Sequence, residues 1–228
     1  MAGSALEVKK ALRDTYVVGL GYVPLGFAFG VFAVTQGFPM WLAVVSSIVI
    51  YAGSMEFTAV GLILSGVSLP QIAITTFFVN FRHLFYGLSF PLHRIRSVPG
   101  RLYGVHALTD EAYALLAPKP AGTLSGVQVL TTEALCQFYW VVGVGGGALV
   151  GNLLTFDTRF LGFALTALFV TLAVDAYKQN HQWGIGLAAF GCAVFGVFLA
   201  RGQMLVIALG LFTVLILANA WFQLRRGK

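Results

Sequence analysis

Residues 15–55 read TYVVGLGYVPLGFAFGVFAVTQGFPMWLAVVSSIVIYAGSM and contain no charged side chain. An apolar stretch of this length holds two membrane-spanning helices of about 20 residues each. The Gly37-Phe38-Pro39 sequence between the two halves is typical of a turn. The stretch ends at Glu56, so an acid directly follows the small residues of the second half. This pattern predicts helices that lie in lipid.

The composition of the whole chain agrees with this prediction. Of 228 residues, 58% are hydrophobic and 10% are charged, and the mean hydropathy is +0.86. A soluble domain carries roughly a quarter of its residues as charged side chains, so most of this surface must face lipid. The length predicts a single transmembrane domain over residues 1–228.

Hydrophobic segments recur along the chain, and lipid requires them to be helical because unpaired backbone is too costly there. We therefore predict an all-α polytopic membrane protein with about seven hydrophobic helical segments, some of them broken. Glycines at 143–151 faintly repeat the pattern of Gly19–Gly30, which raises the hypothesis of an inverted three-helix repeat. The segments are roughly 16–35, 41–65, 70–90, 128–150, 159–176, 184–200 and 203–223.

Basic residues cluster in the N-terminal tail, in the segment of about 91–127 and in the C-terminal tail. By the positive-inside rule, 91–127 should be a cytoplasmic loop with the C-terminal tail on the same side. Lys9, Lys10 and Arg13 also favour the inside for the N-terminal tail. Three full spans before residue 91 would, however, place that tail outside. Two alternatives stay open: the second segment is re-entrant, or the tail is an exception.

Several kinds of chemistry are not indicated. Cys136 and Cys192 lie in apolar runs, and the four histidines show no metal-ligand spacing, so we expect no metal and no cofactor. The net charge of +6 comes from the clusters that flank the apolar segments, so we expect no nucleic-acid partner. Ser54 lacks the GxSxG pattern of a nucleophile elbow, so we do not expect an enzyme.

The first candidate site is the glycine-rich run around Pro24. Gly26 and Gly30 form a GxxxG face that suits close helix packing. Pro24 removes one backbone hydrogen bond and predicts a kink or a break that could contact a ligand. Pro24, Gly26 and Gly30 are therefore candidates both for packing and for substrate binding.

The second candidate is the run from Ala52 to Glu56 in the middle of the second segment. Small residues beside an acid at membrane depth predict a broken helix, which is how many transporters bind substrate. A buried carboxyl group needs a partner or a task, so Glu56 is a candidate proton carrier, with a permanently paired structural acid as the alternative. The substrate-binding candidates here are Ala52, Gly53, Ser54 and Met55.

The third candidate is the NFRHLFYG run at 80–87. Arg82 cannot lose its charge, so it needs an acid, carbonyls or a substrate carboxylate. Glu56 is its nearest acid in the sequence, and snorkelling to the interface is the alternative. Asn80 and Arg82 are substrate-binding candidates, and His83 is a proton-coupling candidate.

The fourth candidate is Thr109 with the two acids that follow it. Asp110 and Glu111 precede an apolar run, which predicts a helix capped by Thr109. The acids are also proton-coupling candidates, and a latch to basic residues of the 91–127 segment is a further hypothesis. Glu133 and Asp175 are further acids near the ends of their segments, either interfacial charges or the next coupling candidates if Glu56 is not the coupling site.

Together these runs resemble the AzlC family of membrane proteins. The matching stretches are PLGFAFGVFAVTQGF at 24–38, YAGSMEF at 51–57, VNFRHLFYGLS at 79–89, LTDEAYALL at 108–116 and GFALTALFVTLAV at 162–174. Many members of the family carry glutamine where this sequence has Glu56.

The resemblance implies a secondary transporter that exports valine, leucine, isoleucine or methionine across the cytoplasmic membrane. The acid at Glu56, and not the resemblance, makes protons the expected coupling ion. It also implies a second, smaller membrane subunit of the AzlD type. A passive small-solute channel is the alternative function, and an intramembrane enzyme is a weaker one.

Overall fold

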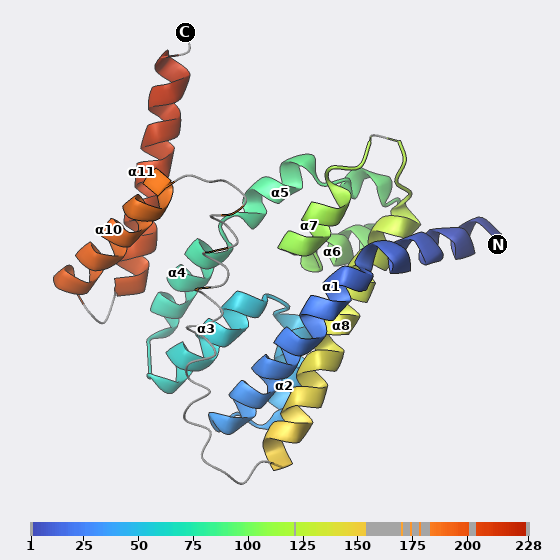
Figure 1. Cartoon of the computed structure of the whole chain (residues 1–228), viewed down its shortest axis with the longest axis horizontal. Helices are drawn as coiled ribbons and strands as arrows, with labels where there is room; N and C mark the ends of the chain where they lie inside the picture. The colour runs from blue at the N-terminus through green and yellow to red at the C-terminus, as the bar shows by residue number, and fades with distance from the viewer. Residues whose placement is uncertain are drawn as a thin grey trace. The chain divides into compact units, whose positions relative to one another are not determined.

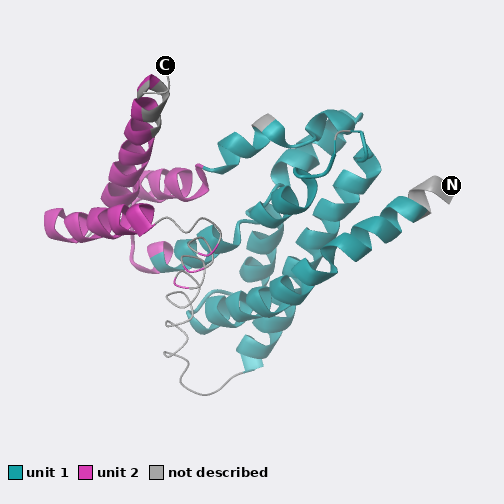
Figure 2. Ribbon diagram, turned by 45° about the horizontal axis from the view of Figure 1, so that its top comes forward, with its two compact units in different colours: residues 1–61, 82–165 teal, residues 62–81, 166–228 magenta. Residues whose placement is uncertain are grey.

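A computed structural model of the protein describes residues 2–120, 122–153, 183–200 and 204–226, together with positions 170, 174 and 178. Within these ranges every regular element is a helix, which confirms the all-α prediction (Figure 1). The chain splits into two compact units, residues 1–61 with 82–165, and residues 62–81 with 166–228 (Figure 2). Each unit is described by itself.

The helices follow most of the predicted segments. The first and fourth segments are single helices, the second and third are each broken in two, and the fifth lies largely outside the described residues. The first unit holds α1 (Ala2–Thr35), α2 (Met40–Val49), most of α3 (Gly53–Leu64), α5 (His83–Ser89), the 3-10 turn η1 (Leu92–Arg94), α6 (Val98–His106), α7 (Asp110–Leu116) and α8 (Gly126–Leu153). The second holds α4 (Leu69–Asn80), α10 (Trp183–Leu199) and α11 (Met204–Arg226).

Among the described residues, two helices are long and apolar enough to cross a membrane, namely Leu6–Thr35 within α1 and Gly126–Leu153, which is α8. The helix α1 continues unbroken through Pro24, so the predicted break at that proline is wrong. A single missing N–H is tolerated because the remaining bonds of the long helix and its packing on α8 hold it in place.

Helices α1 and α8 pack backbone against backbone through glycines. A Cβ atom at Gly26 would lie 2.8 Å from the carbonyl oxygen of Trp140, and one at Gly143 would lie 2.5 Å from that of Val23. Cβ atoms at Gly30 and Gly147 would also collide with the backbone of the opposite helix. The two glycine runs that seemed to repeat each other are therefore two faces of one contact.

The order of these contacts shows that α1 and α8 run in the same direction. Gly19 lies against Tyr139, Gly26 against Trp140 and Val144, and Gly151 against Val31. An inverted repeat of segments 1–3 and 4–6 would require the opposite, antiparallel arrangement. The N-terminal end of α1 thus lies beside the 91–127 segment, where Lys119 forms an ion pair with Asp14.

Helices α2 and α3 form a hairpin. Ile48 near the end of α2 accepts a hydrogen bond from Gln137 of α8, and Phe57 of α3 packs on Phe29 and Phe32 of α1, with ring centroids 5.1 and 5.5 Å apart. The chain therefore runs back along α1 towards Thr35 after the break. This path corresponds to the re-entrant alternative for the second segment.

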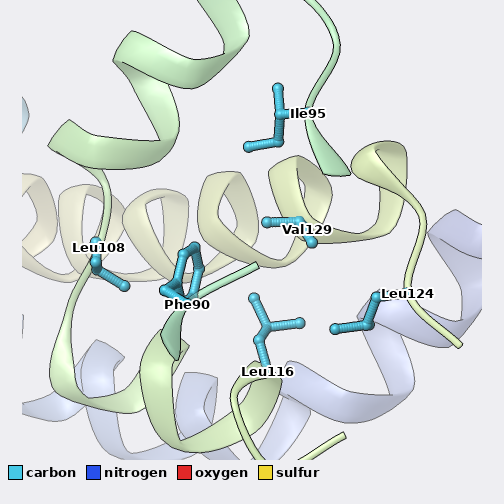
Figure 3. Packing of buried hydrophobic residues seen from close by; sticks show 6 residues of the cluster. All are labelled: Phe90, Ile95, Leu108, Leu116, Leu124 and Val129. Carbon is cyan, nitrogen blue, oxygen red and sulfur yellow. The ribbon is translucent and has the colours of Figure 1, made fainter. Parts of the chain in front are cut away.

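A hydrophobic cluster fastens the 91–127 segment to the start of α8. Figure 3 shows these side chains gathered beside α8, with Val129 projecting from that helix. All are buried, which indicates that the segment is a packed part of the first unit. The cluster consists of Phe90, Ile95, Leu108, Leu116, Leu124 and Val129.

In the second unit α11 contacts both α4 and α10. A Cβ at Gly196 of α10 would lie 2.9 Å from the carbonyl oxygen of Met204, so α10 and α11 approach closely where the chain turns. At the far end of α11 the guanidinium of Arg225 lies 3.7 Å from the ring centroid of Trp221. A Trp–Arg pair at a helix end is typical of a membrane interface.

We expect the replacement of Gly30 by alanine to lower the stability of the protein, because the new methyl group would strike the backbone of α8. Overpacking of this kind costs about 1–3 kcal/mol, which thermal unfolding in detergent would detect. Gly21→Ala is the matched control, since a Cβ there meets nothing within 4 Å. Equal unfolding temperatures for the two variants would contradict the tight α1–α8 contact.

We expect cysteines at Lys9 and Ser97 to react with a membrane-impermeant thiol reagent from the same side of the membrane, and one at Met40 from the opposite side. The parallel α1–α8 pair and the α2–α3 hairpin require this pattern. The native Cys136 and Cys192 would first be changed to alanine. Labelling of Lys9→Cys and Ser97→Cys from opposite faces of sealed vesicles would rule out the arrangement.

Candidate functional site

The break between α2 and α3 lies at Ile50, Tyr51 and Ala52. Tyr51 is buried and has a φ of 45°, in the left-handed region that is unusual for a bulky residue. The predicted break within residues 52–56 is confirmed only at its first position, because α3 already begins at Gly53. A strained residue that the surrounding packing holds in place is typical of a functional site.

Because α2 ends at this point, its last carbonyl groups lack partners within the helix. The carbonyl oxygen of Ile48 accepts a hydrogen bond from Gln137 Nε2 at 3.1 Å and lies 3.0 Å from His106 Nε2. His106 is the last residue of α6. The tip of the α2–α3 hairpin therefore meets the turn between α6 and α7.

The turn between α6 and α7 is the tip of a second hairpin, whose two helices are shorter. Thr109 caps α7 and accepts a hydrogen bond from the N–H of Ala112, which confirms the predicted helix start. The hydroxyl of Tyr22 lies 3.2 Å from Thr109 Oγ1 and donates to the carboxylate of Glu111. These bonds tie the second tip to α1.

Glu56 is 1% exposed and joins three helices. Its Oε1 lies 3.1 Å from Ser46 Oγ on α2, and its Oε2 accepts a hydrogen bond from Trp140 Nε1 on α8 at 2.9 Å. Both oxygens are thus engaged by neutral groups. The expected pairing of Glu56 with Arg82 is not the one that the structure shows.

Arg82 instead pairs with Asp110. Its Nη2 lies 2.6 Å from Asp110 Oδ2, and its Nε donates to Asp110 Oδ1 at 2.8 Å, which is a two-point contact. Tyr86 also donates to Oδ1 at 2.6 Å. The hypothesis of a latch from Asp110 or Glu111 to basic residues of the 91–127 segment is therefore wrong, since Asp110 holds Arg82 and Glu111 holds Tyr22.

The remaining predicted residues fall in several places. Gly53 faces Trp140, and a Cβ at Gly53 would lie only 3.0 Å from the indole ring. Met55 is buried. The carbonyl of Ala52 accepts a hydrogen bond from the N–H of Glu56, and the carbonyl of Ser54 accepts one from Thr58 Oγ1.

Three further predicted positions lie elsewhere: Gly26 and Gly30 lie in the α1–α8 contact, and Asn80 ends α4 in the second unit. His83 packs on Tyr86, with ring centroids 5.2 Å apart.

Sequence reasoning missed the polar face of α8. Glu133, Gln137 and Trp140 follow one another at helical spacing, and all three contact residues near the two tips. The interpretation of Glu133 as an interfacial charge is wrong, because its side chain is fully buried. The spacing of polar groups at i, i+4 and i+7 in an apolar helix was the signal that could have revealed this face.

The aromatic environment of Trp140 completes the site. Its ring stacks on Phe29 at 6.2 Å and meets the edge of Tyr22 at 5.8 Å. Phe57 contacts Phe29 at 5.1 Å. The end of α2, the buried carboxyl group of Glu56 and this aromatic cluster thus adjoin one another inside a body of apolar helices, an arrangement that fits a membrane protein.

Comparison with known proteins makes the assignment specific. The family model described as "AzlC protein" matches residues 17–154. The chain therefore belongs to the AzlC family, as its motifs predicted.

Individual relatives extend over almost the whole chain. It is 38% identical over 222 residues to an uncharacterized membrane protein of Helicobacter pylori, covering 90% of this chain and 96% of the relative. It is 31% identical over 215 residues to the branched-chain amino acid transport protein AzlC of Bacillus subtilis, covering 91% and 84%. It is 28% identical over 224 residues to the inner membrane protein YgaZ of Escherichia coli, covering 90% and 89%. No solved structure matches it at a significant level.

We expect Glu56→Gln to keep the fold and Glu56→Ala to weaken it. A glutamine can accept from Trp140 and donate to Ser46 in the places of the two carboxyl oxygens, whereas alanine leaves a buried donor unpaired. An unpaired buried group costs about 1–3 kcal/mol. Thermal unfolding of both variants measures the difference, and equal losses would show that these two bonds do not hold the hairpin to α8.

Proposed function

We propose that this protein is the large subunit of a secondary transporter that exports branched-chain amino acids across the cytoplasmic membrane in exchange for protons. The observation that carries the proposal is the broken α2–α3 hairpin, whose tip holds the buried Tyr51 and brings helix ends close to an aromatic cluster. The name of the Bacillus subtilis relative, a branched-chain amino acid transport protein, supports the substrate class.

The backbone at the tip suits a zwitterion. Carbonyls at the end of α2, such as that of Ile48, are acceptors for an ammonium group. The first N–H groups of α3, from Gly53 onward, are donors for a carboxylate. Only Ile50, Tyr51 and Ala52 separate the carbonyl acceptors of α2 from the N–H donors of α3, so the two charged groups of one amino acid can bind to both.

The aromatic cluster beside the tip suits an aliphatic side chain. Phe29, Phe57 and Trp140 contact one another and are all buried. An apolar surface of this type distinguishes substrates that differ by one methylene by about 1–3 kcal/mol only. We therefore propose that valine, leucine, isoleucine and methionine share the site.

The small subunit is part of the same proposal. The motif resemblance implies an AzlD-type partner, and the outer faces of α1 and α8 present exposed apolar side chains such as Val17, Leu20 and Phe138 to lipid or to another helix. Co-purification of a tagged chain with the small subunit from native membranes supports this part, and transport by the large subunit alone would remove it.

We expect proteoliposomes that contain the protein and its small subunit to move labelled leucine with saturable kinetics, and a pH gradient to accelerate the movement. Gly53→Leu should reduce the flux at least tenfold, because the new side chain would collide with the Trp140 indole and displace it from the tip. Gly61→Leu is the matched control on the same helix, since a Cβ there meets nothing within 4 Å.

Two results would contradict the proposal. Flux that does not saturate and ignores the pH gradient would indicate a passive channel. Equal flux in Gly53→Leu and Gly61→Leu would place the substrate path away from the α2–α3 tip.

A further inference from the structure

Glu133 is the most unusual charged side chain of the first unit. It lies on α8 with 0% of its surface exposed, and neither of its carboxyl oxygens has a hydrogen-bond partner among the described residues. The hydroxyl groups of Thr132 and Tyr51 are also buried and unpartnered. A carboxylate left bare in this way is among the most costly groups that a protein can bury.

The neighbours of Glu133 do not offset that cost. The titratable groups that interact with it are Tyr103 on α6 and Cys136 on its own helix, and both are neutral near physiological pH. Gly104 of α6 covers the carboxyl directly, since a Cβ there would lie 3.3 Å from Glu133 Oε2. Leu92 and Ile95 lie on this same side of Gly104, next to the carboxyl group. No cation of the described chain neutralises the acid, so the closed arrangement suits its protonated form.

Glu56 differs in this respect. Each of its oxygens already has a partner, and an amide could form the same two bonds. Glu56 therefore has a structural task that does not depend on gaining and losing a proton. Glu133 has no such task in the described contacts.

We propose that Glu133, rather than Glu56, carries the coupled proton of the transport cycle. This inference rests on the proposed function. Glu133 as carboxylate takes up one proton at the outer side to become the neutral acid, and it releases that proton inside when α6 uncovers it. A neutral zwitterion leaves as one proton enters, so each cycle moves one positive charge inward.

The α6–α7 hairpin is the cover that must move. Tyr103 next to Gly104 donates to Gln137, and His106 at the end of α6 contacts the carbonyl of Ile48. A displacement of α6 that exposes Glu133 therefore also changes the contacts at the tip of α2–α3. This shared helix is the physical link between proton release and the substrate site.

The test compares Glu133→Gln with Glu56→Gln in proteoliposomes that contain both subunits. Glutamine imitates the protonated acid, so Glu133→Gln should lose at least tenfold of the leucine movement driven by a pH gradient. It should keep leucine–leucine counterflow, which needs no proton. Glu56→Gln should keep the wild-type ratio of gradient-driven movement to counterflow, because an amide can form the same two bonds and no proton is lost from the cycle.

A second measurement does not require transport. Dicyclohexylcarbodiimide reacts with protonated carboxyl groups inside membranes, and mass spectrometry locates the modified peptide. We expect modification of Glu133 in the wild type and in Glu56→Gln, declining as the pH rises. Absence of modification at every pH where the protein stays folded would overturn the inference.

The remaining outcomes are decisive as well. Gradient-driven transport that survives in Glu133→Gln would overturn the assignment of Glu133 while leaving the proposed function intact. If the variant loses both activities, Glu133→Asp decides: restored gradient-driven transport with a shifted pH profile supports the inference, and no restoration overturns it. A wild type that moves no leucine in either mode would refute the proposed function itself, and the coupling role with it.

Discussion

The close contact between α1 and α8 is the constraint on which the first unit depends. Lipid gives two apolar helices little reason to associate, so the attraction must come from packing at short range. Gly26 and Gly30 on one helix and Gly143 and Gly147 on the other remove every side chain from the crossing, which lets the two backbones touch. Because the helices run parallel, the contact also places the start of α1 beside the 91–127 segment.

Once that pair is set, the rest of the unit is arranged along α8. Backbone that leaves a helix inside an apolar body needs partners, and α8 supplies them: Gln137 binds the end of α2, and Trp140 binds Glu56 of α3. The same face reaches Tyr103 and Gly104 of α6. Two hairpins that are far apart in the sequence thus meet because one helix presents polar groups at a helical spacing.

The sequence predicts the local features of this arrangement well. The cap at Thr109, the helical segments and the break near Ala52 depend on neighbouring residues, and the structure contains all three. The unbroken helix at Pro24 shows the limit, since its continuity depends on α8.

Partnerships across the fold are less predictable. Trp140 is 84 residues from Glu56 and has no charge, so the distribution of charges could only suggest Arg82. The burial of a side chain is equally difficult to predict from the sequence. In the sequence, Glu133 lies near the start of a long apolar helix and resembles an interfacial acid. The structure shows that α6 covers it. A buried carboxyl that is already bonded in place can be exchanged for an amide without loss, whereas an unbonded one is tolerated only if its cost is recovered in another state of the protein. That difference separates the two acids of this unit: Glu56 holds the hairpin to α8, and Glu133 makes the closed arrangement depend on a proton.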